Sequence, residues 1–168
     1  MRKIVIGVMG PGSGASETDK KNAYQLGTLI AQEGWVLLTG GRNAGVMDAA
    51  SRGAKAAKGL TVGILPNSGD RGLSEAVDIA IITGMGSARN NINVLSSDVV
   101  IACGMGAGTA SEVALALKAS KAVILLTSDQ QSQLFFNSLS DNNIFLATSP
   151  EAAIAFVKET LTNRCPTE

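Results

Sequence analysis

Short apolar runs alternate along the chain with segments whose apolar positions recur at helical spacing. The apolar runs, which are typical of buried strands, cover residues 4–9, 35–39, 61–65, 77–82, 97–103, 122–126 and 144–147. The helical patterns between them cover residues 16–33, 46–57, 90–96, 110–119 and 150–162. Because most of these runs are apolar on both faces and strands alternate with helices along the chain, the pattern predicts an α/β fold with a doubly wound, Rossmann-like parallel sheet of about six to seven strands flanked by helices.

Two stretches depart from this regular alternation. Residues 67–75 are polar and rich in turn formers, and we expect a connector that lies over the site. The Gln-rich segment 128–143 has an ambiguous pattern, for which we expect one helical turn around 134–139. The pattern contains no linker or repeat, so residues 1–162 are expected to form one domain and residues 163–168 a flexible tail.

Two helix starts carry the spacing of a capping box, in which a hydroxyl residue and an acidic residue three positions later satisfy each other's backbone N–H groups. One is Ser16 with Asp19, before the first helical pattern. The other is Thr109 with Glu112, before the pattern at 110–119. On spacing alone, helix capping therefore explains Glu112 better than a chemical role does.

Glycine-rich loops follow three of the predicted strands, at residues 10–15, 40–45 and 104–109. The carboxyl ends of parallel strands share one edge of a sheet, so these loops are expected to converge there. Unpaired backbone N–H groups at a helix N-terminus stabilise an anion, and glycines let it approach closely. The loops therefore predict a site for a small phosphate-bearing molecule, although the first loop alone could be a tight turn. The expected binding residues are Gly10, Gly12, Ser13, Gly40, Gly41, Gly104, Gly106, Ala107, Gly108 and Thr109.

Three charged side chains lie near these loops. Arg89 follows the strand at 77–82 and is expected to face the loop at 104–109, where a planar guanidinium suits a phosphate; the alternative is a solvated loop charge. Arg42 either adds a second cation or points to water. Glu112 either caps its helix or faces the ligand. Cys103 is most simply a buried apolar residue.

Composition narrows the functional classes. Lys and Arg together number 14, equal to Asp and Glu, so the chain has no surplus charge for nucleic acid or an anionic membrane. With no His and only two Cys, no protein-ligated metal site is expected, and a reducing cytoplasm fits. No Lys stands out as a pyridoxal phosphate ligand. NAD is disfavoured because Thr39–Gly41 replaces the acidic residue that dinucleotide folds place after the second strand. The Ala/Leu-rich helix at 110–119 predicts a subunit interface.

Several of these segments together resemble the Lonely Guy superfamily, long mislabelled as lysine decarboxylases and built on a Rossmann-like domain of the SLOG type. The resemblance covers roughly residues 3–126 and rests on 40–47, Arg89, 97–102 and 106–112. Members of its best-known branch are phosphoribohydrolases that cleave the N-glycosidic bond of cytokinin riboside 5′-monophosphates. The resemblance implies that Arg89 and Glu112 match that branch's catalytic residues, and that Gly106, Gly108 and Thr109 match its phosphate loop.

Several positions depart from the hydrolase pattern. Gly104 and Met105 replace its Pro-Gly, Ala88 replaces an acidic residue, Asn90 replaces a Lys, and Asp48 replaces a Gly. With these changes the chain looks more like the branch of molybdenum cofactor carrier proteins from algae and cyanobacteria. That resemblance implies a non-catalytic homo-oligomer, a dimer or a tetramer, with molybdoenzymes or cofactor-synthesis proteins as further partners.

The two branches imply different chemistry at one crevice. A carrier holds and protects molybdopterin, with its terminal phosphate and oxidation-sensitive molybdenum dithiolene, and needs no protein ligand to the metal. A phosphoribohydrolase needs Glu112 to stabilise an oxocarbenium-like transition state while Arg89 holds the substrate. The carrier is the first expectation, and the nucleoside 5′-monophosphate phosphoribohydrolase is the alternative.

Overall fold

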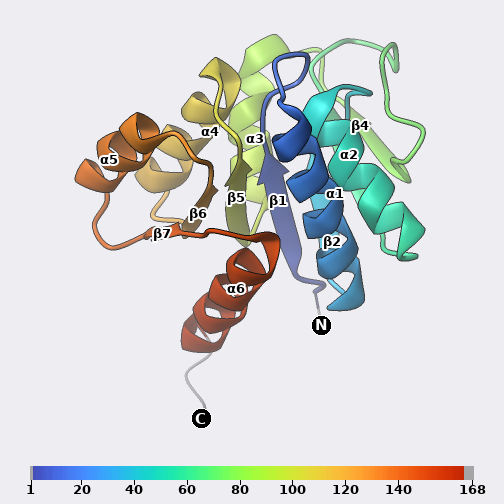
Figure 1. Cartoon of the computed structure of the whole chain (residues 1–168). Helices are drawn as coiled ribbons and strands as arrows, with labels where there is room; N and C mark the ends of the chain where they lie inside the picture. The colour runs from blue at the N-terminus through green and yellow to red at the C-terminus, as the bar shows by residue number, and fades with distance from the viewer. Residues whose placement is uncertain (1, 165–168) are drawn as a thin grey trace.

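The computed structural model describes residues 2–164 and is built around one parallel sheet with helices on both faces (Figure 1). The strands are β1 (Val5–Met9), β2 (Val36–Thr39), β3 (Thr61–Leu65), β4 (Ile79–Ile82), β5 (Val99–Cys103), β6 (Val123–Leu126) and β7 (Ile144–Leu146). The helices are α1 (Glu17–Gln32), α2 (Gly45–Ala56), α3 (Arg89–Ser96), α4 (Ala107–Lys118), α5 (Gln130–Ser138) and α6 (Pro150–Arg164). A 3₁₀ turn, η1 (Gly86–Ala88), precedes α3.

The seven strands run in the order β4-β3-β2-β1-β5-β6-β7, and every neighbouring pair is parallel. The predicted doubly wound α/β sheet is therefore confirmed. No helix in the described part of the chain combines the length and the apolar character needed to cross a bilayer.

Alternate residues of the central strands feed two separate cores. Ile6 and Val8 of β1 pack with α1, α2 and α6, whereas Met9 packs with α3, α4 and α5 on the other face. A strand that is buried on both faces needs apolar side chains at every position, because successive side chains point to opposite faces. The continuous apolar runs of the sequence have this origin.

Helices α1 and α2, which follow the loops after β1 and β2, pack closely against each other. A Cβ added to Gly27 would lie 2.0 Å from the Ala50 carbonyl oxygen, and one added to Gly53 would lie 1.9 Å from the Tyr24 carbonyl oxygen. Glycines at the crossing therefore let the two helix backbones touch. The predicted capping box of Ser16 and α1 is confirmed, since the Ser16 side chain and the helix's third residue satisfy each other's N–H groups.

Three segments differ from the sequence prediction. The Gln-rich region forms a nine-residue helix, α5, because Asp129 caps it by accepting from the Gln131 N–H, so the predicted single turn at 134–139 was too short. Strand β4 begins at Ile79, since the Asp78 carboxylate accepts from Thr61 N–H at the start of β3. Helix α6 reaches Arg164, two residues into the predicted tail; residues 165–168, with Cys165, lie outside the described part.

The connector at 67–75 is tied to the loop after β2 instead of lying over the site. Asn43 N–H donates to the Gly72 carbonyl, and Ser74 N–H donates to the Gly41 carbonyl. The Ser74 hydroxyl also donates to the Asp48 carboxylate at 2.6 Å. None of residues 67–75 is among those that line the pocket described below, whereas the adjacent Pro66 is.

The topology places a crevice between β1 and β5. The chain leaves β1 toward α1 on one face of the sheet and leaves β5 toward α4 on the other face. Ligands of doubly wound folds bind at such a switch point, outside the carboxyl ends of the strands.

Candidate functional site

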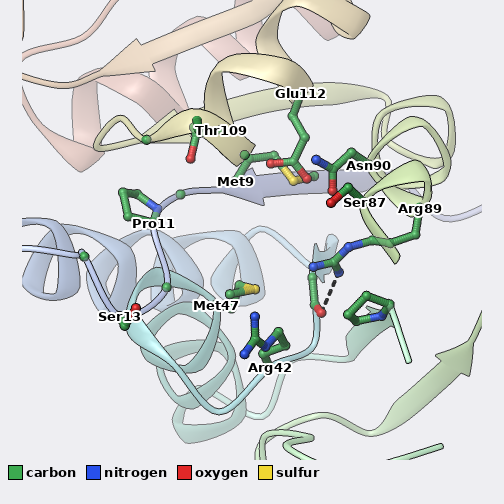
Figure 2. Close-up of a pocket in the computed structure, with 18 of the residues that line it drawn as sticks. Met9, Pro11, Ser13, Arg42, Met47, Ser87, Arg89, Asn90, Thr109 and Glu112 are labelled. Atoms are coloured by element: carbon green, nitrogen blue, oxygen red, sulfur yellow. Dashed lines mark hydrogen bonds between the residues drawn. The ribbon is translucent and has the colours of Figure 1, made fainter. Parts of the chain in front are cut away.

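A pocket of about 430 Å³ occupies this switch point, a size that suits a small organic ligand (Figure 2). It brings together the loops after β1, β2 and β5 with η1 and the start of α3. Of the residues that the sequence predicted, its lining includes Gly10, Gly12, Ser13, Gly40, Arg42, Arg89, Gly106, Ala107, Gly108, Thr109 and Glu112.

Two predicted residues, Gly41 and Gly104, are not among the residues that line the pocket. Both have positive φ, at +75° and +74°, and both serve turns. A Cβ on Gly41 would meet Gly63 of β3 at 3.0 Å, and one on Gly104 would meet the Asp19 carboxyl group at 2.7 Å. These glycines therefore shape the loops from behind the pocket wall.

The first turn of α4 forms an anion cradle at one side of the pocket. Gly106 is the N-cap and makes no side-chain cap, so the N–H groups of the first turn have no acceptor inside the helix. The Thr109 hydroxyl is buried and has no hydrogen-bond partner among the described residues, although a buried hydroxyl normally has one. An oxyanion in the pocket would satisfy both sets of donors.

The capping role predicted for Thr109 and Glu112 is wrong. Helix α4 begins at Ala107, so Thr109 is its third residue instead of its N-cap, and Glu112 lies in the second turn. The extended backbone of Gly106, with φ −161° and ψ 171°, starts the helix three residues earlier than the spacing suggested. With capping excluded, the carboxyl group of Glu112 needs another explanation.

Glu112 projects from α4 into the pocket and is 7% exposed (Figure 2). Its Oε1 accepts from Asn93 Nδ2 at 2.7 Å. Burial raises the pKa of Glu112 to about 7, and this effect outweighs the hydrogen bond from Asn93 and the positive charge of Arg89, which both lower it. The carboxyl group is thus poised to exchange a proton near neutral pH.

This shift predicts a pH-dependent stability that Glu112→Gln abolishes. A folded-state pKa raised from 4.5 to about 7 means that the native state holds the proton more tightly, so stability falls as pH rises through this window. At pH 4 the two proteins should be equally stable to urea. At pH 8 the variant should be more stable by about 3 kcal/mol, from about 1.4 kcal/mol per pKa unit. A constant difference at both pH values would contradict the shift.

Arg89 lies at the floor of the pocket and joins two strand ends. Its Nη1 donates to the carbonyl oxygens of Gly40, at 2.6 Å, and of Ile64. Gly40 permits this approach, because a Cβ there would lie 2.5 Å from Nη1. The guanidinium is therefore a brace between β2 and β3, and its Nη2 and Nε have no hydrogen-bond partner among the described residues. These donors remain available to a ligand.

Arg89 has no carboxylate within salt-bridge distance among the described residues, although it is only 8% exposed. Burial lowers the pKa of Arg89, and the neighbouring Arg42 lowers it further, while Glu112 opposes both. Arg42 is exposed and lines the pocket beside Met47 (Figure 2). Two guanidinium groups with little local compensation favour an anionic occupant.

Sequence reasoning missed several residues of the site. Asn93, fully buried on α3, contacts Glu112, and it lies four residues after Arg89 on the same face of that helix. The four-residue spacing between Arg89 and Asn93 could have predicted from the sequence that Asn93 lies beside the site. In the pocket lining itself, the sequence reasoning missed Met9 and Ser87, which no motif marked because they meet the other residues only through the fold.

Cys103 is a free, fully buried thiol outside the pocket lining. Burial raises its pKa to about 12, so the thiol stays protonated and unreactive. Among the described residues no group of three His, Cys, Asp or Glu side chains could hold a metal ion.

Fold and pocket together define a Rossmann-like α/β protein with a small-molecule site at the switch point of its sheet. The chain belongs to the SLOG cluster4 family, whose model matches residues 3–154.

Solved structures with high similarity cover almost the whole chain. The molybdenum cofactor binding protein of the phototrophic bacterium Rippkaea orientalis is 66% identical, with a TM-score of 0.95, over 96% of this chain and 99% of that one. The Moco carrier protein of Chlamydomonas reinhardtii is 53% identical, with a TM-score of 0.91 and the same coverage. A protein of Archaeoglobus fulgidus is 48% identical over 126 residues, which are 75% of this chain and 82% of that one.

Proposed function

We propose that this protein binds and carries the molybdenum cofactor, holding it in the pocket at the switch point. The observation that carries the proposal is the similarity, at 66% and 53% identity over 96% of the chain, to two proteins described as binding or carrying this cofactor. The residues of the pocket provide an independent test, because their chemistry can be compared with that of the cofactor's phosphate and ring system.

The anionic end of the cofactor suits the anion cradle. A terminal phosphate needs hydrogen-bond donors, and the first-turn N–H groups of α4 and the unpartnered Thr109 hydroxyl supply them. Arg42 lines the same pocket and adds positive charge. This arrangement binds a phosphate without an ordered lysine or a bound metal ion.

The remainder of the pocket suits a flat, partly apolar ring system. Met9, Met47, Pro11 and Pro66 contribute apolar surface to its lining. The cofactor brings its own sulfur ligands to molybdenum, so the protein needs none. In this role the chain supplies binding, orientation and shielding from water and oxidants, and it breaks no bond.

An anaerobic binding titration tests the proposal. Purified protein is titrated with molybdenum cofactor, and in parallel with AMP and a cytokinin riboside monophosphate while released base is quantified. Tight cofactor binding with no base release supports the carrier. Weak cofactor binding overturns it.

Glu112 favours one alternative, a nucleoside 5′-monophosphate phosphoribohydrolase. A buried carboxyl group beside a phosphate site, with no capping role, could stabilise positive charge that develops on a ribose. Release of base from either nucleotide in the same titration, lost in Glu112→Gln, would make this the function. No release from any nucleoside monophosphate would exclude it.

We also propose that the protein is a homo-oligomer. All four residues of the edge strand β4 are exposed, including Ile79, Ile81 and Ile82 at 43–49%. A bare apolar edge strand is a site for association with another chain. The interface predicted for the Ala/Leu-rich helix α4, on which Ala114 is exposed, stays a prediction.

We expect Ile81→Lys to dissociate this oligomer. A buried lysine on an apolar interface is unfavourable, so the mass measured by light scattering should fall from a multiple of 17.2 kDa toward that value. Leu134→Lys, at a position on α5 that is 73% exposed, is the matched control and should leave the mass unchanged. A wild-type mass of one chain would refute the oligomer, and an unchanged mass for Ile81→Lys would move the interface away from β4.

A cytoplasmic location, and molybdoenzymes or cofactor-synthesis proteins as further partners, belong to the same proposal. The free thiol of Cys103 is consistent with a reducing compartment. A cargo that is delivered elsewhere requires an accepting protein.

A further inference from the structure

Asn93 and Glu112 form a buried pair that the phosphate cradle does not use. Asn93 is 0% exposed, and its Nδ2 donates to Glu112 Oε1 at 2.7 Å across the contact between α3 and α4. Glu112 belongs to the pocket lining, and its Oε2 has no hydrogen-bond partner among the described residues. The hydrogen bond therefore engages one carboxyl oxygen and leaves the other for the ligand.

Once an anionic ligand is bound, the positive charges near Glu112 no longer compensate the negative charge of an ionised Glu112 carboxylate. The cation that faces it is Arg89 of α3, which forms no salt bridge with it, and Arg42 acts on Arg89 from the loop after β2. Among the described residues that line the pocket, Arg42, Arg89 and Glu112 are the ones with charged side chains. A ligand phosphate in the same pocket of about 430 Å³ draws on these same cations and repels the carboxylate. Uptake of one proton by the carboxylate removes that repulsion.

We propose that Asn93 is a positioning residue that directs this proton to Glu112 Oε2, so that the protein binds its anionic ligand together with one proton and Glu112 acts as a neutral hydrogen-bond donor to it. The inference rests on the proposed carrier function. An amide N–H prefers the carbonyl-like oxygen of a protonated carboxyl group, which keeps Oε1 as acceptor and places the hydrogen on the oxygen that faces the pocket.

Calorimetry of cofactor binding at pH 8, in two buffers with different ionisation enthalpies, measures this proton directly. With a free-state pKa of about 7, Glu112 is mostly ionised at pH 8, so about 0.9 proton should be taken up per ligand bound. A phosphate monoester is already a dianion there, since its second pKa is near 6. Between pH 7 and pH 9 the apparent Kd should rise by about 50-fold, because the protonated fraction falls from about one half to about one hundredth.

Two variants and one control test whether the proton that is taken up binds to Glu112. Glu112→Gln keeps a donor at Oε2's place and should bind with no proton uptake and little dependence on pH. Asn93→Leu removes the donor that lowers the pKa of Glu112, so the midpoint of the affinity–pH curve should move upward, by about one pH unit. A merely structural role of Asn93 would weaken binding equally at every pH. Glu159→Gln, at an exposed position on α6, is the control and should behave as wild type.

The outcomes separate this inference from the function on which it rests. Tight cofactor binding without proton uptake, or the same uptake in Glu112→Gln, overturns the inference alone. Failure of the wild-type protein to bind cofactor overturns both. Uptake of about one proton that is lost in Glu112→Gln establishes it.

Discussion

Replacing Arg89 with methionine is expected to destabilise the fold and to abolish ligand binding. The guanidinium bridges the ends of β2 and β3 through the Gly40 and Ile64 carbonyls, and methionine leaves both without a donor. Each unsatisfied buried carbonyl costs about 1–3 kcal/mol, so we expect a loss of about 2–4 kcal/mol in urea unfolding. For a chain of this size that lowers Tm by about 5–15 °C. Cofactor affinity should fall at least 100-fold, since about 3 kcal/mol is lost with a charge-assisted contact.

The variant Gly40→Ala distinguishes two roles of Arg89, its bridge between β2 and β3 and the positive charge that it brings to the pocket. Its Cβ would lie 2.5 Å from Arg89 Nη1, so the flexible guanidinium must move away from the carbonyls while the positive charge stays in the pocket. This variant should lose stability in the same direction as Arg89→Met but keep more of the affinity. If Arg89→Met unfolds at the same urea concentration as wild type, the brace contributes nothing.

Gly108→Val is expected to weaken ligand binding strongly while leaving the fold intact. A Cβ at Gly108 has no atom within 4 Å, so the free protein has room for a side chain there. Gly108 is in the first turn of α4 and belongs to the pocket lining, so a valine side chain would occupy space that the bound phosphate needs. Loss of one or two charge-assisted hydrogen bonds should weaken cofactor affinity about 100-fold.

Gly69→Val is the matched control for this substitution. A Cβ at Gly69 also has no atom within 4 Å, but Gly69 is not among the residues that line the pocket. The control should bind cofactor as the wild type does. Unchanged affinity in Gly108→Val would show that the phosphate lies elsewhere, and a parallel loss of stability would show that the substitution acts through the fold.

The sequence predicted two capping boxes with the same spacing, of which one formed and the other did not. The difference shows that local spacing alone does not determine where a helix begins. Ser16 caps α1 as its spacing predicts, because the chain before it is a loop. Thr109 is preceded by Ala107 and Gly108, which already belong to the helix, so the same spacing falls inside α4. Spacing alone could not choose between these registers, since the start of α4 is decided where the chain leaves β5.

The pattern of apolar runs was sufficient to predict the sheet, its parallel strands and the edge at which the glycine loops meet. Alternation of buried strands with amphipathic helices permits few other arrangements, because right-handed crossovers return each strand to the same edge. Most of the predicted site residues line one pocket for this reason.

The tertiary structure alone decided what the polar groups of that pocket do. Arg89 reaches the Gly40 and Ile64 carbonyls, which lie 49 and 25 residues away in the chain, and Asn93 reaches Glu112 from another helix. These contacts depend on packing between elements and leave no mark at any fixed spacing. Local chemistry along the chain therefore determined the fold and the position of the site, whereas long-range packing determined the burial, and through it the protonation, of the groups inside it.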